Sequence, residues 1–315
     1  MQINKPTKQL TEAALFLSIA MVFSWIGFSF MPLLLIVLPL PFIVAGSRIG
    51  FKYTVISLLL CFLLITFTID PLTGLFFIFG FSGMILSIDW GLKKRKKMYQ
   101  TIILSIFTTL LGLLVYLLMF DKITGLPFKE LISQTFDQMF EMNEALFKSA
   151  GVSGKEIDGI MAQMKDAVVF VKQIFPSTLI LYASFLVYLN YTLSISVLRK
   201  MKLTVIKIPA FRNFEIPREL FIGVLSFIAF AMICFFTKKL NYIVILNNVL
   251  FLSSILFFVQ GLSLLIFIFN KYKVKNFVRV FVIIMSFLYS PLVIMITGVG
   301  FLDRLVHFRK IEKLK

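Results

Sequence analysis

Histidine, cysteine and acidic residues are scarce in this chain. It has one His and two Cys, and 15 Asp and Glu stand against 32 Lys and Arg. His307 lies in a basic tail, and Cys61 and Cys234 each lie within an apolar run, so neither a disulfide nor a metal site is expected. No Asp, Glu, Lys or Arg lies in the middle of an apolar run, which disfavours ion pumps and proton-coupled transporters. We expect no metal and no cofactor.

A catalytic constellation is also missing. Gly80-Phe81-Ser82-Gly83 matches the Gly-x-Ser-Gly pattern of intramembrane serine proteases. That chemistry needs a base within hydrogen-bond reach of the serine, and the single His lies outside the apolar runs. We expect Ser82 to act as a small residue for helix packing, and the protein not to be an enzyme. A cleavable signal peptide is not expected either, since no small-x-small cleavage site follows the apolar run 10–26.

Long apolar runs dominate what is present. Hydrophobic residues make up 59% of the chain, which has 38 Phe and a mean hydropathy of +0.97, whereas soluble domains are about 45–50% apolar. About 20 apolar residues cross a bilayer as a helix, and uninterrupted runs exclude alternating barrel strands. The fold class predicted is all-α, a polytopic transmembrane helical bundle.

Nine apolar runs are separated by short loops and one polar insert. They cover residues 10–26, 31–45, 53–69, 71–88, 99–120, 176–198, 217–236, 242–269 and 277–301. The second run holds three prolines and should be kinked or broken. Asp70-Pro71 is a helix-start signal for the fourth. Because Ser290-Pro291 interrupts the last run, nine spans are expected, or eight if that run re-enters.

Basic residues gather where the runs end. With the amino terminus in the cytoplasm, the loops after spans two, four, six and eight carry basic residues and face the cytoplasm, as the positive-inside rule favours. Two groups run against the rule: Lys238-Lys239, and the basic tail 304–315 if the last run crosses fully. The clusters Lys93–Lys97 and Arg199–Lys202 are expected to contact anionic lipids. Nucleic acid is not an expected partner despite the net charge of +17, because no soluble domain remains to bind it. The prediction is a multi-pass protein of the cell membrane.

The polar insert 121–175 is predicted to form an extracytoplasmic helical hairpin. Apolar residues recur at helical spacing over 128–147, and Ser153-Gly154-Lys155-Glu156 reads as a capping box before a second amphipathic helix. The hairpin either covers the mouth of the bundle or lies on the membrane surface. Two domains follow: 1–199, a six-span unit that includes the hairpin, and 200–315, a three-span unit with a basic tail.

Polar residues within the runs are the candidate ligand contacts, because polar groups are costly in lipid. The candidates are Asn190, Tyr191, Asn247, Ser254 and Gln260. The alternative is that they form hydrogen bonds between helices without a ligand. Asp303 is expected to cap a helix or to pair with Arg304 or Arg309.

The first run carries a strip of small residues. Ala13, Ala14, Ser18 and Ala20 recur at about helical spacing, and Ala14-x-x-x-Ser18 fits the small-x-x-x-small pattern. Such strips let another helix approach closely. The partner is either a neighbouring span of this chain or a separate membrane subunit.

Several short motifs resemble the YybS family. They are Thr11-Glu12-Ala13-Ala14, Leu38-Pro39-Leu40-Pro41-Phe42 with Arg48-x-Gly50, Gln260-Gly261, and Gly300-Phe301-Leu302-Asp303 with Arg309-Lys310. That family contains uncharacterised multispanning proteins of Gram-positive bacteria, so the resemblance implies a membrane protein without an established activity. More distantly, the first six spans resemble the substrate-binding subunits of energy-coupling-factor transporters. This second resemblance implies that the first helix docks a membrane partner and that external loops close over a ligand.

Two functions are therefore expected from different classes. The first is a transporter-like protein that binds a small neutral or amphipathic solute beneath the hairpin. The second is a non-catalytic scaffold for envelope or membrane assembly, which binds partners through the first helix and the basic loops.

Overall fold

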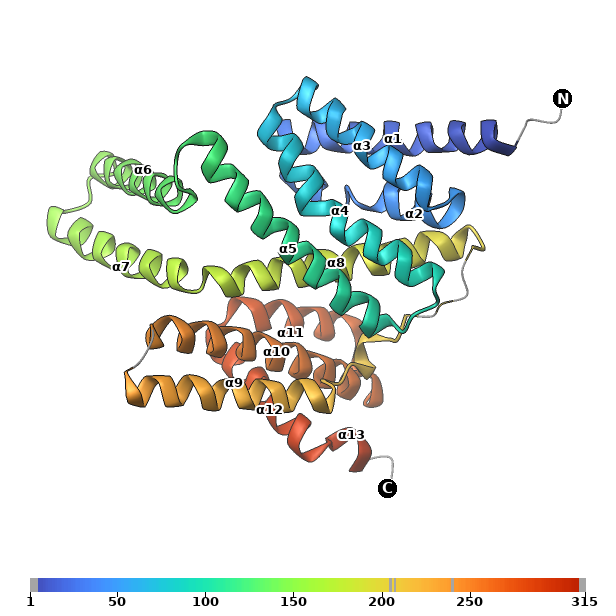
Figure 1. Cartoon of the computed structure of the whole chain (residues 1–315). Helices are drawn as coiled ribbons and strands as arrows, with labels where there is room; N and C mark the ends of the chain where they lie inside the picture. The colour runs from blue at the N-terminus through green and yellow to red at the C-terminus, as the bar shows by residue number, and fades with distance from the viewer. Residues whose placement is uncertain (1–4, 204–205, 207, 239–240, 312–315) are drawn as a thin grey trace. The chain divides into compact units, whose positions relative to one another are not determined.

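The computed structural model describes residues 5–203, 206, 208–238 and 241–311, and every regular element within them is a helix (Figure 1). The helices are α1 (Lys5–Ser29), η1 (Pro32–Ile36), α2 (Leu40–Ile49), α3 (Phe51–Thr68), α4 (Pro71–Lys93), α5 (Met98–Thr124), α6 (Phe128–Ser149), α7 (Gly154–Gln173), α8 (Phe175–Lys200), η2 (Phe211–Asn213), α9 (Arg218–Thr237), α10 (Tyr242–Lys271), α11 (Asn276–Leu288), α12 (Ser290–Val306) and α13 (Phe308–Ile311). Two of these, η1 and η2, are 3₁₀ helices. The all-α class is confirmed.

Within the described residues, eight helical stretches are long and apolar enough to cross a membrane. A ninth crossing results if α11 and α12 count as one span, and these two helices meet at a bend of 103°. Tyr289 separates them, and Pro291 lies in the first turn of α12, where its missing N–H costs no hydrogen bond. The predicted interruption of the last run is confirmed. The choice between the predicted counts of eight and nine spans depends on whether this bent pair crosses the membrane.

The second run is broken, as its prolines predict. Pro32 opens η1, the chain turns through Val37–Pro39, and α2 begins at Leu40 with Pro41 in its first turn. The fourth run begins as expected, since the Asp70 carboxylate accepts a hydrogen bond from the N–H of Thr73 at 2.9 Å and caps α4.

The chain packs as two compact units. Unit 1 comprises residues 1–168 and 179–206, and unit 2 comprises residues 169–178 and 207–315. In unit 1, α4 contacts both α3 and α5, and α1 contacts η1, α2 and α3. In unit 2, α10 contacts α9, α11, α12 and η2. The predicted boundary between residues 199 and 200 stays a prediction.

Glycine allows α10 and α12 to touch at their backbones. A Cβ atom built on Gly300 would overlap the carbonyl oxygen of Phe257 and lie 2.6 Å from the backbone nitrogen of Gly261. A Cβ on Gly261 would in turn overlap the carbonyl oxygen of Ile296. Side chains are therefore excluded from this crossing, which is the close approach that small residues permit in membranes.

The polar insert forms the two expected helices, α6 and α7, joined by a turn in which Gly151 has a φ of 75°. The Glu156 carboxylate accepts hydrogen bonds from the hydroxyl of Ser153 at 2.8 Å and from its N–H at 3.4 Å, so the predicted helix start is confirmed. No described residue of α6 is fully buried, whereas Ile157, Met161 and Val168 of α7 are. The extracytoplasmic position of this pair stays a prediction.

Candidate functional site

The five predicted ligand contacts lie in both units. Asn190 and Tyr191 belong to α8 in unit 1, while Asn247, Ser254 and Gln260 belong to α10 in unit 2. Each group is described within its own unit below. Their role in ligand binding stays a prediction.

Asn190 closes the break in the second span. Its side-chain amide donates to the carbonyl of Ile36, the last residue of η1, at 2.7 Å and to the carbonyl of Leu186 at 2.9 Å. Both Asn190 and the neighbouring Tyr191 are fully buried. Helix interruption in a membrane is tolerated where protein groups hydrogen-bond the freed carbonyls, and Asn190 performs that task here. Its Oδ1 atom is buried without a hydrogen-bond partner among the described residues.

Asn247 and Asn248 hold the end of α7 against α10. The Asn247 amide donates to Oε1 of Gln173 at 2.7 Å, and the Asn248 amide donates to the carbonyl of Gln173 at 2.7 Å. Asn248 Oδ1 accepts from the N–H of Ser177 at 2.9 Å. Ser254 lies away from these contacts, on the exposed side of α10. The side-chain amides of Asn247 and Asn248 therefore already hydrogen-bond α10 to the end of α7 and the start of α8.

Gln260 belongs to a buried polar cluster formed with Ser263, Asp303 and Arg309. Its Oε1 accepts from the N–H of Ile216 at 2.9 Å, and its Nε2 donates to Oδ2 of Asp303 at 2.5 Å. The same carboxylate oxygen lies 3.3 Å from Nη2 of Arg309. All four side chains of this cluster are buried. The expected pairing of Asp303 is confirmed, and its partner is Arg309.

Arg309 extends that cluster to the segment before α9. Its Nη1 donates to the carbonyls of Arg212 at 3.0 Å and Phe214 at 2.8 Å, and its Nη2 donates to the Ser263 hydroxyl at 3.2 Å. A buried charge is tolerated when it is paired and hydrogen-bonded, and this guanidinium is both. The cluster thus fastens α10, α12 and the segment after η2 together.

The small-residue strip of α1 divides between two faces. Ala13 and Ala20 are buried, and Ala13 packs with Ala45, Ile49 and neighbouring aromatic rings. Ala14 and Ser18 are exposed. The Ser18 hydroxyl donates to the carbonyl of Ala14 at 2.9 Å, so the exposed pair presents no free donor. The buried half serves packing within this chain, and docking of another helix on the exposed half stays a prediction.

A shallow groove continues from the exposed pair. It has a volume of about 310 Å³ and is lined by Ser18, Ile19, Val22 and Phe23. Ala14, Ser18 and Val22 follow one another at intervals of four residues, which places them on one face of α1. This face combines small and apolar residues without a charge.

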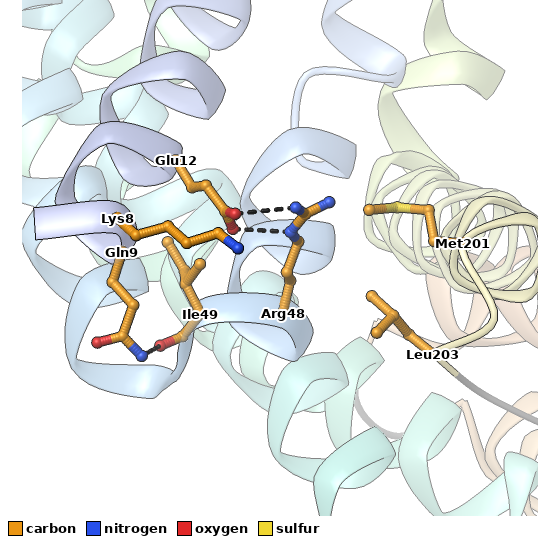
Figure 2. Close-up of a pocket in the computed structure, with 7 residues that line it drawn as sticks. All are labelled: Lys8, Gln9, Glu12, Arg48, Ile49, Met201 and Leu203. Carbon is orange, nitrogen blue, oxygen red and sulfur yellow. Dashed lines mark hydrogen bonds and ion pairs between the residues drawn. The ribbon is translucent and has the colours of Figure 1, made fainter. Parts of the chain in front are cut away.

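A second pocket, with both charged and apolar residues in its lining, lies where α1 begins and where α2 and α8 end (Figure 2). Its volume is about 440 Å³, and its lining is Lys8, Gln9, Glu12, Arg48, Ile49, Met201 and Leu203. Arg48 binds the Glu12 carboxylate at both oxygens, from Nε at 2.7 Å and from Nη2 at 2.8 Å. Sequence reasoning did not join this pair, although Thr11-Glu12 and Arg48-x-Gly50 were both among the family motifs.

A buried carboxylate near the end of α4 also escaped sequence reasoning. Asp89 is fully buried, its Oδ2 accepts from the Lys93 ammonium at 2.6 Å, and its Oδ1 has no partner among the described residues. A Cβ on Gly46 would lie 2.6 Å from that carboxylate. Asp89 closes the gap between α2 and α4. The rest of the Lys93–Lys97 cluster is exposed, with the Lys96 ammonium 5.6 Å from the Trp90 ring.

The Gly-x-Ser-Gly segment packs α4 against α5. The Ser82 hydroxyl donates to the carbonyl of Ile78 within its own helix. A Cβ on Gly83 would lie 2.8 Å from the carbonyl oxygen of Thr108, so the glycine is needed for close approach. Among the residues that the structure describes, no three His, Cys, Asp or Glu side chains lie together in a way that could hold a metal ion.

Comparisons with known proteins agree with a membrane protein. A family described as "Predicted membrane protein (DUF2232)" matches residues 13–304. "Uncharacterized protein YybS" of Bacillus subtilis (strain 168) is 23% identical over 310 residues, which cover 97% of this chain and 98% of that protein. No solved structure matches. The sequence-based resemblance to the YybS family is confirmed, and the likeness to energy-coupling-factor subunits stays a prediction.

Proposed function

We propose, from the premise that this chain belongs to the DUF2232 family of predicted membrane proteins, that it is a non-catalytic membrane scaffold. In this proposal it binds another membrane-spanning helix along the exposed face of α1. The observation that carries the proposal is the exposed pair Ala14 and Ser18 with the adjoining groove at Ile19, Val22 and Phe23.

Helix association in lipid depends on close packing, since the bilayer supplies no hydrophobic drive between helices. The exposed face of α1 is suited to close packing, because Ala14 and Ser18 are short and the Ser18 hydroxyl is already hydrogen-bonded within the helix. The alternative, a solute held by amides, has less support from the structure. The amide nitrogens of Asn190 and Asn247, and both amide atoms of Gln260, already form hydrogen bonds within the protein.

Cross-linking at the middle of α1 tests the scaffold. Ser18→Cys would be introduced after Cys61 and Cys234 are replaced by Ala, and its thiol would be labelled with a photo-cross-linker that inserts into C–H bonds of neighbouring proteins on illumination. Leu111→Cys is the control, because Leu111 is also exposed and lies near the middle of α5. The expected result is a discrete cross-linked product at position 18 and none at position 111.

The masses of the cross-linked products also identify the partner on the exposed face of α1. A product of twice the protein's mass denotes a second copy, and a product of another mass denotes a different membrane protein. Ala14→Phe should remove either product, because a bulky ring blocks close approach. Equal cross-linking at positions 18 and 111, or persistence in Ala14→Phe, would refute the scaffold.

A second candidate is the transporter-like binding of a small neutral or amphipathic solute. One observation favours it: Asn190 Oδ1 is a buried acceptor without a partner in the described part of the chain. A buried acceptor of this kind is costly unless something donates to it. A thermal-shift screen against vitamins, nucleobases, lipids and envelope precursors should then give a saturable shift. The shift should vanish in Asn190→Leu and persist in Ser196→Ala, because Ser196 is exposed on the same helix. A flat response of folded protein argues against this candidate.

The orientation proposed for the chain places its amino terminus in the cytoplasm of the cell and the exposed Lys93–Lys97 cluster against anionic lipid. A membrane-impermeant maleimide should label Lys155→Cys in intact cells. Lys94→Cys should be labelled only after permeabilisation. The reverse pattern would invert the proposed topology.

A further inference from the structure

The pocket between the start of α1 and the ends of α2 and α8 has charged residues on one side and apolar residues on the other. Lys8, Gln9, Glu12 and Arg48 form one side, and Ile49, Met201 and Leu203 form the other. In a membrane protein, helix ends lie near the boundary between headgroups and hydrocarbon. A ligand in this pocket would meet charged groups and apolar groups at once.

The charged side of the pocket is positive. Glu12 and Arg48 compensate one another through two short hydrogen bonds, so Lys8 supplies the net positive charge of the lining. Figure 2 shows the remaining guanidinium nitrogen of Arg48 pointing away from Glu12, on the side of Met201. An anion here would find one guanidinium edge and one ammonium, which are the donors that bind phosphate oxygens.

The surroundings strengthen this preference. Met201 and Leu203 belong to a segment that also carries Arg199, Lys200 and Lys202, all exposed. The apolar side chains are accessible too, since Leu203 is 48% exposed. A free small anion would gain nothing from them, whereas an acyl chain would.

We propose that this pocket binds the phosphate headgroup of an anionic phospholipid, with Lys8 and Arg48 on the phosphate and Leu203 against the start of an acyl chain. The site is separate from the face of α1 that carries Ala14 and Ser18. None of the residues Lys93–Lys97 lines this pocket. The proposal therefore stands or falls independently of the scaffold function.

Native mass spectrometry of the full chain in detergent tests the site with phosphatidylglycerol as the probe. Lys8→Gln removes the uncompensated charge at an exposed position, so the fold is preserved. Binding should weaken about fivefold, the equivalent of about 1 kcal/mol for one lysine near a lipid surface. Lys52→Gln is the matched control, since Lys52 is exposed on α3 but does not line the pocket. Its affinity should match that of the unmodified protein.

Two further arms identify the source of the phosphate. Leu203→Ser should weaken phosphatidylglycerol binding, because the acyl contact is lost, and millimolar inorganic phosphate should not displace the lipid. If inorganic phosphate does displace it and Leu203→Ser changes nothing, the ligand is a free phosphate and the lipid proposal is overturned. Equal effects of Lys8→Gln and Lys52→Gln would overturn it as well, because binding would then be a general property of surface charge.

Discussion

Replacing Gly300 with Ala would force α10 and α12 apart. The added methyl group would overlap the carbonyl oxygen of Phe257 and lie 2.6 Å from the backbone nitrogen of Gly261. Both obstacles are backbone atoms, so no rotamer change can relieve the clash. Gly298 offers a matched comparison on the same helix, because a Cβ there meets nothing within 4 Å.

The size of the effect follows from two terms. Overpacking a tight contact costs about 1–3 kcal/mol. Replacing a helical glycine by alanine also gains about 1 kcal/mol in helix propensity, but both variants share that gain. We therefore expect Gly300→Ala to be less stable than Gly298→Ala by about 1–3 kcal/mol.

A thiol-reactive fluorogenic dye can report this difference for unit 2 alone. In a Cys61→Ala background the remaining thiol is Cys234, which is buried in α9 and becomes reactive when unit 2 unfolds. At about 2–4 °C per kcal/mol, Gly300→Ala should melt about 2–12 °C below Gly298→Ala.

Equal melting of the two glycine variants would refute the reasoning. It would mean that α10 and α12 do not touch at Gly300 in the folded protein. A lower melting point for Gly298→Ala would be a stronger contradiction, since that position is open.

Three further perturbations test other contacts. In a double-mutant cycle, Glu12→Gln and Arg48→Gln should show a coupling of about 0.5–1 kcal/mol, because the pair is partly exposed; an additive result contradicts the ion pair. Asn190→Leu should cost about 1–3 kcal/mol, because the carbonyl of Ile36 loses its amide partner; in a Cys234→Ala background, the dye reaction of Cys61 measures this cost against the parent chain. Asp303→Ala should cost about 3–5 kcal/mol, because it leaves a buried guanidinium without its carboxylate; unchanged melting followed at Cys234 would show that the cluster does not hold unit 2.

The helices were predictable because their signals are local. Asp70-Pro71 caps and opens α4, and the prolines of the second run break it, without help from distant residues. The bend at Tyr289 was also signalled, by the proline that follows it. Its angle was not, since packing against α10 sets the direction in which α12 continues.

The candidate site was less predictable, because its hydrogen-bond partners lie far apart in the sequence. The sequence singled out Asn190 and Gln260 as polar residues in lipid, and both are indeed buried. It could not show that their amide nitrogens already donate hydrogen bonds to distant groups, a carbonyl 154 residues away and an aspartate 43 residues away. Glu12 and Arg48 are 36 residues apart and were recognised only as separate motifs.

The contact between Asn190 and Ile36 has a consequence for biosynthesis. The two residues are 154 positions apart, and at about 5–20 residues per second the ribosome needs about 8–30 s to make the intervening chain. The broken second span is thus made well before the amide that completes it. During that interval the carbonyl of Ile36 must accept its hydrogen bond from water or from the insertion machinery. Nascent chains that stop before α8 should consequently be poorer substrates for stable insertion, and better substrates for membrane proteases, than chains that include it.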